Sequence, residues 1–169
     1  MPLRAGLLLS CCLGAVAGHA HEPLVGRVLP PYPDGLRELE GTCLSDSTDL
    51  ERACDFGIAV LGTATEDGGE RTLLHVVAQR SLPHDGREPR WEVTDAVDYP
   101  PVAPGYFLQV STCRFDGADD ARIAALVRHD PASEYSTDVA WARQLDFASG
   151  RLLELDPLRV DCLNEYPGE

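Results

Sequence analysis

The sequence predicts a mainly β domain, with a β-dominated α+β domain as the alternative. We expect an antiparallel meander of about six to seven strands, with one or two short helices near the N-terminus. Short runs of residues alternate apolar and polar side chains, which is typical of half-buried strands. Clusters of Gly, Pro and Asp separate these runs at short intervals, as turns do. A chain of 169 residues with 44% hydrophobic composition is sufficient for one core.

The first twenty residues have the features of a signal peptide. Arg4 precedes an apolar run over 5–16, and 18–20 contains the small residues that a signal peptidase recognises. No later stretch is continuously apolar for 18 residues, so we expect no transmembrane segment in the mature chain. Cleavage after residue 20 would leave a periplasmic or secreted protein. The alternative is a lipoprotein signal that leaves a lipidated Cys11 and holds the domain on a membrane.

The composition excludes several classes of function. Loss of the leader removes Arg4 and no acidic residue, so the mature chain has 13 basic and 28 acidic residues and a net charge of −15. Nucleic acids and anionic lipids are poor partners for such an acidic surface. The chain contains no lysine, which excludes Schiff-base catalysis and the lysine of phosphate-binding loops. The arginine- and alanine-rich usage is typical of a GC-rich bacterial genome.

Four cysteines remain after the leader, and an even number in an exported chain indicates two disulfides. Three pairings are possible. We favour Cys43–Cys54 as a local bridge and Cys113–Cys162 as a bridge that holds the C-terminus against the meander. A zinc site of four cysteines is disfavoured because the chain has no Cys-x-x-Cys pair.

The mature chain divides into an arm and a domain. Four prolines within 21–35 predict an extended arm with polyproline character, and 36–169 form a single disulfide-stapled β-rich domain. Leu36 and Leu39 lie three residues apart at the start of this domain, as on a helix. Ser45 or Asp46 could then cap a second short helix that runs toward Cys54.

Two hairpins frame the predicted strands that follow. The first joins 56–63 to 71–80 around a turn that contains Asp67-Gly68-Gly69. The second joins 138–146 to 151–155 around Ser149-Gly150.

Three more strands lie between the hairpins, over 91–97, 106–115 and 121–128. The segment 121–128 is apolar on both faces, so as a strand it would be central in a sheet. A helix over 119–128 fits the same residues, because they also follow helical spacing. We favour the strand.

No catalytic or metal-binding motif stands out. The Gly-x-Ser-x-Gly motif does not occur, and 116–120 lacks the acidic spacing of an EF-hand loop, so we interpret it as a turn. His21, as the new N-terminus, could bind copper only with a second histidine nearby. The candidates for that histidine share no predicted element at ligand spacing: His75, His84 and His129. We expect no metal and no cofactor.

The leading hypothesis is a non-catalytic binding or interaction protein whose partner is a protein or small ligand of the cell envelope. The alternative is a small extracytoplasmic hydrolase or metal-binding protein that uses acidic residues or His21. Aromatic side chains dominate binding surfaces, and Tyr99 and Tyr135 lie in predicted loops, so they are the candidate interaction residues. Three further aromatic residues fall within predicted strands and are expected in the core: Trp91, Tyr106 and Trp141.

Overall fold

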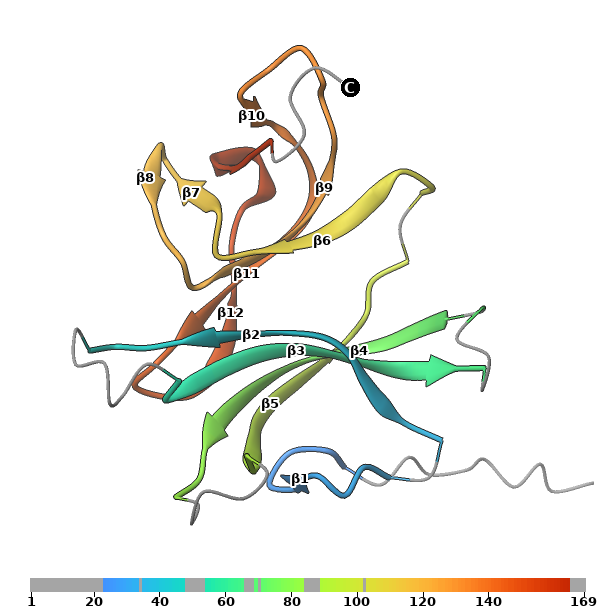
Figure 1. Ribbon diagram of the computed structural model, residues 1–169. Coiled ribbons are helices and arrows are strands. Elements are labelled where there is room, and N and C mark those ends of the chain that lie inside the picture. Colours follow the sequence, from blue (N-terminus) through green and yellow to red (C-terminus); the bar gives the residue numbers. More distant parts are fainter. Residues whose placement is uncertain are drawn as a thin grey trace, which may run out of the picture.

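The fold is β-dominated, as the sequence predicts (Figure 1). The computed structural model describes residues 23–33, 35–47, 54–65, 69, 71–83, 89–101 and 103–164. Within these residues, thirteen strands form three antiparallel sheets, so the predicted number of six to seven strands is wrong. The described helical structure is the 3-10 turn η2 (Pro157–Arg159), and no described helix is long and apolar enough to cross a membrane.

The first sheet has the strand order β1-β5-β4-β3-β2. Its strands are β1 (Val28–Leu29), β2 (Arg37–Leu44), β3 (Phe56–Ala64), β4 (Arg71–Ser81) and β5 (Trp91–Asp98). The predicted hairpin is confirmed as β3 and β4, in which Val60 lies opposite Val76. The predicted helix that begins at Leu36 is wrong, because this segment pairs with β3 as β2, with a bulge between Glu38 and Glu40. The second predicted helix falls largely on 48–53, outside the described residues.

The second and third sheets have four strands each, in the orders β12-β11-β9-β6 and β10-β13-β7-β8. The second sheet contains β6 (Tyr106–Val110), β9 (Ile123–Arg128), β11 (Asp138–Asp146) and β12 (Arg151–Glu154). The third contains β7 (Cys113–Phe115), β8 (Ala118–Asp119), β10 (Tyr135–Ser136) and β13 (Val160–Leu163).

The second and third sheets decide two of the predictions made from the sequence. The segment 106–115 is not one strand but two in different sheets, because Ser111, at a φ of 73°, breaks the extended backbone. The strand interpretation of 121–128 is confirmed by β9, and the helical alternative is wrong.

The three sheets form layers, with the second sheet between the other two (Figure 1). Ile58 and Val76 of the first sheet pack with Ala124 and Leu145 of the second in one core. On the opposite side of the second sheet, a further core combines residues of β9 with residues of the third sheet: Ile123, Ala125, Val127, Cys113 and Cys162. Ile123–Val127 are therefore completely buried, as predicted for a central strand.

The outer face of the first sheet is covered over only part of its area. Leu24 and Leu29 of the arm pack against Leu61 and Val77, and β1 pairs with β5 at the edge of the sheet. The arm is thereby attached to the domain by burial and by backbone pairing. The neighbouring part of this face carries the candidate site described below.

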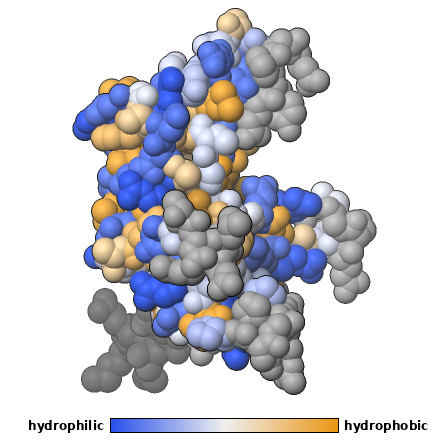
Figure 2. Space-filling view, turned by 60° about the vertical axis from the view of Figure 1, so that its left-hand side comes forward, coloured by the Kyte–Doolittle hydropathy of each residue, from blue (hydrophilic) through white to orange (hydrophobic). Residues whose placement is uncertain are grey.

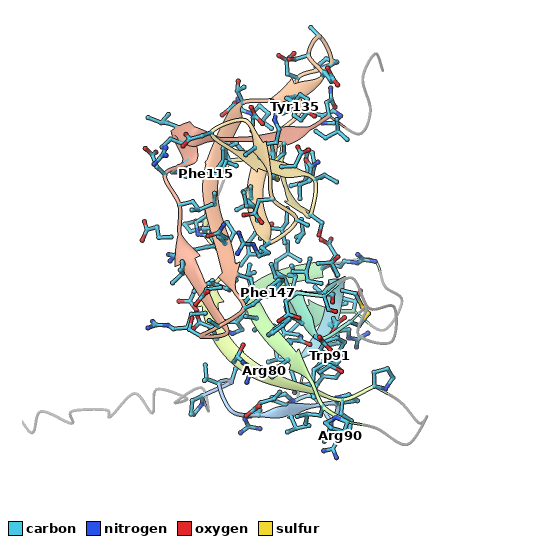
Figure 3. All side chains as sticks on the ribbon, turned by 90° about the vertical axis from the view of Figure 1, so that its left-hand side faces the viewer. Arg80, Arg90, Trp91, Phe115, Tyr135 and Phe147 are labelled. Carbon is cyan, nitrogen blue, oxygen red and sulfur yellow. A yellow bond between two sulfur atoms is a disulfide. The ribbon has the colours of Figure 1, made fainter. Side chains whose placement is uncertain are left out.

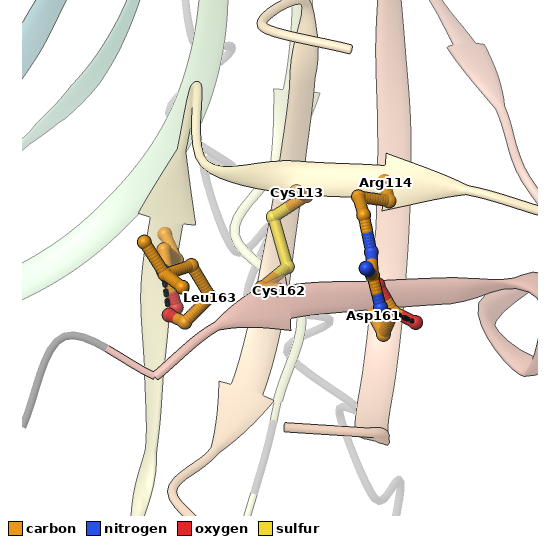
Figure 4. Close-up of polar contacts among 6 residues, drawn as sticks. Cys113, Arg114, Asp161, Cys162 and Leu163 are labelled. Carbon is orange, nitrogen blue, oxygen red and sulfur yellow. Dashed lines mark hydrogen bonds and ion pairs between the residues drawn. A yellow bond between two sulfur atoms is a disulfide. The ribbon is translucent and has the colours of Figure 1, made fainter. Parts of the chain in front are cut away.

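Both predicted disulfides are confirmed, Cys43–Cys54 and Cys113–Cys162. Figure 4 shows the second bridge joining β7 to β13, beside the ion pair between Arg114 and Asp161. Cys113 and Cys162 are at most 1% exposed, whereas Cys43 and Cys54 lie at the surface. Two disulfides are typical of proteins from oxidising, extracytoplasmic environments.

Candidate functional site

The two tyrosines predicted to contact a partner lie in different parts of the molecule, and both are half-buried. Tyr99 follows β5 and packs against the core between the first and second sheets. Burial raises the pKa of its hydroxyl, and the negative charge of Glu40 raises it further. Tyr135 lies in β10, with the Arg114 guanidinium 3.3 Å from its ring centroid. Their role in binding stays a prediction.

The acidic turn at 116–120 is held by arginines. Asp116 has a φ of 52° and forms an ion pair with Arg159, whose hydrogen bonds lower the pKa of the Asp116 carboxyl. Asp120 accepts hydrogen bonds from Arg122 and Gln144. This arrangement agrees with the interpretation of 116–120 as a turn.

The histidines considered as metal ligands do not form a metal site in the described part of the chain. The structure shows no group of three His, Cys, Asp or Glu side chains arranged for a metal among its described residues. His75 lies 3.3 Å from Asp98, and His129 forms an edge contact with Phe107. His21 and His84 lie outside the described residues.

A recess of about 150 Å³ opens on the outer face of the first sheet, beside the area that the arm covers. We call it the Trp91 recess and define it by the residues that shape it: Glu38, Gly41, Cys43, Gly57, Gln79 and Trp91. These residues come from four adjacent strands, β2, β3, β4 and β5. Figure 3 shows Trp91 in the lower half of the molecule and Tyr135 near its upper end.

Two glycines in the floor of the Trp91 recess allow neighbouring side chains to lie close to the sheet. A Cβ at Gly57 would lie 3.1 Å from the Thr42 carbonyl oxygen and 3.5 Å from the Trp91 ring. A Cβ at Gly41 would lie 2.5 Å from Oε1 of Glu38, so the carboxylate occupies the space above this glycine. The Tyr32 hydroxyl donates a hydrogen bond of 3.2 Å to the other carboxylate oxygen. The arm therefore helps to position the acid at the rim.

Gln79 is the unusual residue of the recess. It lies opposite Gly57 in the β3–β4 pair and is only 3% exposed. Its side-chain nitrogen is buried and has no hydrogen-bond partner in the part of the chain that the structure describes. A buried donor without a partner costs about 1–3 kcal/mol of stability. Such a group is a candidate for contact with a ligand.

The other buried amides in the described residues have partners. Gln109 donates to the Thr112 hydroxyl and to the Leu163 carbonyl, each at 2.6 Å (the Leu163 contact is drawn in Figure 4). Asn164 donates to two carbonyl groups, of Asp130 and Ser133, at 2.7 and 2.9 Å. Gln79 thus departs from the pattern by which this fold satisfies its buried amides.

Sequence reasoning missed this site. Trp91 was expected in the core because it begins an alternating strand, whereas it is half-buried at the recess. The available signal was Gln79, a polar residue that directly follows the apolar run 76–78 in a predicted strand. Its position beside Gly57 depends on the β3–β4 register, which the composition of either strand does not specify.

No family model, curated protein or solved structure matches the chain. Function must therefore be inferred from the residues and geometry of the chain itself.

Proposed function

We propose that this protein is a non-catalytic, extracytoplasmic binding protein and that the Trp91 recess is its ligand site. The observation that carries the proposal is the buried side-chain nitrogen of Gln79, which has no hydrogen-bond partner among the described residues, in the same recess as the half-buried Trp91 ring. Concave sites that combine an aromatic ring with a few polar groups are the usual form of small-molecule sites. On the face of the molecule seen in Figure 2, hydrophobic patches lie between hydrophilic residues.

The environment of the acidic turn supports binding over acid–base catalysis. Asp116 and Asp120 each accept hydrogen bonds from an arginine, which lower the pKa of both carboxyl groups. A carboxylate held in this way is stabilised in its charged form and is a poor proton donor.

The binding function can be tested with a mixed set of small compounds and ligand-observed NMR. The set comprises neutral sugars, amino acids, dipeptides, amines and carboxylic acids. We expect at least one class to bind the wild-type protein and to bind Gln79→Leu at least 10-fold more weakly. If no class binds, or if the binding class binds both proteins equally, the proposal is wrong.

The location of the protein outside the cytoplasm is part of the proposal, and the two disulfides support it. Expression of the full chain in a bacterial host followed by fractionation should place it in the periplasm or the medium, with His21 at its N-terminus. Mass spectrometry of the N-terminal peptide checks this prediction. A lipidated Cys11 in the membrane fraction would establish the lipoprotein alternative, and an uncleaved cytoplasmic chain would contradict both.

A further inference from the structure

Three groups of different chemistry meet in the Trp91 recess: an indole ring, a carboxylate and an amide. Trp91 is half-buried, Glu38 is exposed at the rim, and Gln79 is buried in the floor. A ligand held by all three must place an apolar face on the ring. It must also offer a donor to the Glu38 carboxylate and an acceptor to the Gln79 N–H group.

A neutral hydroxyl-bearing ligand meets these requirements best. One hydroxyl oxygen can donate and accept, so adjacent hydroxyls can serve both Glu38 and Gln79. An anion would lie beside Glu38 on a chain with a net charge of −14, and repulsion would oppose its binding. A simple cation would suit Glu38 and Trp91 but would offer no lone pair to the Gln79 nitrogen.

The size and position of the recess favour a single ring. Its volume of about 150 Å³ is below the range of roughly 300–1,000 Å³ for sites that enclose drug-sized ligands. Its floor lies on the face of the sheet, where Gly41 and Gly57 carry no side chain. Extended peptides usually bind at the edge of a sheet instead, through backbone hydrogen bonds.

Building on the binding function proposed above, we propose that the Trp91 recess binds one neutral saccharide unit. One face of the sugar ring packs on Trp91, one hydroxyl accepts a hydrogen bond from Gln79, and another hydroxyl donates to Glu38. The Tyr32 hydroxyl holds the Glu38 carboxylate in place from the arm.

The first test measures sugar binding to the exported wild-type protein. The probes are the methyl glycosides of glucose, galactose and mannose, together with N-acetylglucosamine, and the readouts are ligand-observed NMR and calorimetric titration. We expect saturation by at least one sugar, with a dissociation constant on the order of 1 mM for a single unit in an open recess.

Substitutions then locate the sugar. Gln79→Leu removes a buried donor that has no partner among the described residues, so it should weaken binding at least 10-fold without lowering the melting temperature. Glu38→Gln should weaken it about 3- to 10-fold, since the uncharged amide oxygen is the poorer acceptor. Glu154→Gln makes the same change at an exposed carboxylate on β12 of the second sheet, so it is the matched control and should leave binding unchanged.

The outcomes separate this inference from the proposed function. Sugar binding that is equal in wild type, Gln79→Leu and Glu38→Gln would place the sugar elsewhere and overturn the inference. If no sugar binds but another class of compound binds and is lost in Gln79→Leu, the saccharide inference fails and the binding function stands. If nothing binds, both fail.

Discussion

At the scale of single residues, glycines decide how closely neighbouring strands of the first sheet approach. Gly62 lies at a bulge between β3 and β4, and a Cβ there would overlap the Thr72 carbonyl oxygen and lie 2.8 Å from Leu39. At Gly41, by contrast, a Cβ would press mainly on the end of the flexible Glu38 side chain. The two glycines therefore differ in what a methyl group would displace.

Gly62→Ala should lower the free energy of unfolding by about 1–3 kcal/mol, because rigid backbone must move to admit the methyl group. Gly41→Ala should change it by less than about 0.5 kcal/mol, because a surface side chain can rotate away. Urea unfolding followed by circular dichroism measures both values. Equal effects of the two substitutions would show that the close approach at Gly62 is not important for stability.

Asp120 joins the acidic turn to β11. Its carboxylate accepts hydrogen bonds from the backbone and guanidinium groups of Arg122 and from Gln144, at 2.5 to 3.0 Å. Burial acts to raise the pKa of this carboxyl, but the hydrogen bonds and the charge of Arg122 outweigh burial and lower it from 3.8. The folded state therefore holds the charged form more strongly than the unfolded chain does.

The lowered pKa makes the contribution of Asp120 to the free energy of unfolding dependent on pH. The contribution is complete above the unfolded pKa near 3.8 and is lost as the pH falls through the lower folded pKa. We expect Asp120→Asn to be less stable by roughly 1–2 kcal/mol at pH 7, and we expect this difference to shrink below about pH 4. Urea unfolding of both proteins from pH 2.5 to 7 tests it, and a difference that grows on acidification would contradict it.

At the scale of elements, each disulfide connects segments that strand pairing also brings together. Cys113 and Cys162 are opposite one another in the β7–β13 pair and close a sequence separation of 49 residues. Cys54 lies two residues before β3, and its bridge to Cys43 in β2 closes a separation of 11. The longer loop removes more conformational freedom from the unfolded chain.

Removal of the two bridges should therefore have unequal effects. Loop-closure entropy predicts a loss of about 4 kcal/mol for Cys113→Ser with Cys162→Ser and about 3 kcal/mol for Cys43→Ser with Cys54→Ser. Thermal and urea unfolding of the two double variants measure the difference. Mild reduction of the native protein should open the surface bridge Cys43–Cys54 first, which alkylation and peptide mapping detect. Earlier alkylation of Cys113 and Cys162 would contradict this order.

At the scale of the whole molecule, the second sheet belongs to both cores. Its contacts with the first sheet include the stacked rings of Phe56 and Phe147, whose centroids are 4.4 Å apart. Hydrogen bonds cross between the same sheets, from the Thr94 hydroxyl to the Gly150 carbonyl at 2.7 Å and from the Leu152 amide to the Asp95 carboxylate at 2.9 Å. The loss of the middle layer would expose both cores at once.

We therefore expect the three sheets to unfold in one cooperative transition. The two tryptophans report on different layers, since Trp91 lies in β5 of the first sheet and Trp141 lies in β11 of the second. In Trp141→Phe and Trp91→Phe, the fluorescence of the remaining tryptophan should have the same urea midpoint as the circular dichroism of that variant. Separate midpoints would show that the layers unfold independently.

The sequence by itself predicted the β-dominated class, both hairpins, the central strand β9 and both disulfide pairs. These features depend on local alternation, turn residues and the number and spacing of the cysteines, all of which can be recognised along the chain. The strand interpretation of 121–128 is correct because its two apolar faces serve two different cores.

The tertiary structure alone decided the number of strands, the division into three layers and the place of the candidate site. The short strands β1, β8 and β10 have two residues each, too few to show a period, and they exist because a neighbouring strand supplies their hydrogen bonds. The Trp91 recess depends on side chains from four strands whose registers bring Gly57 beside Gln79. Register is a property of paired strands, so one strand's sequence does not show which residue will lie across from it.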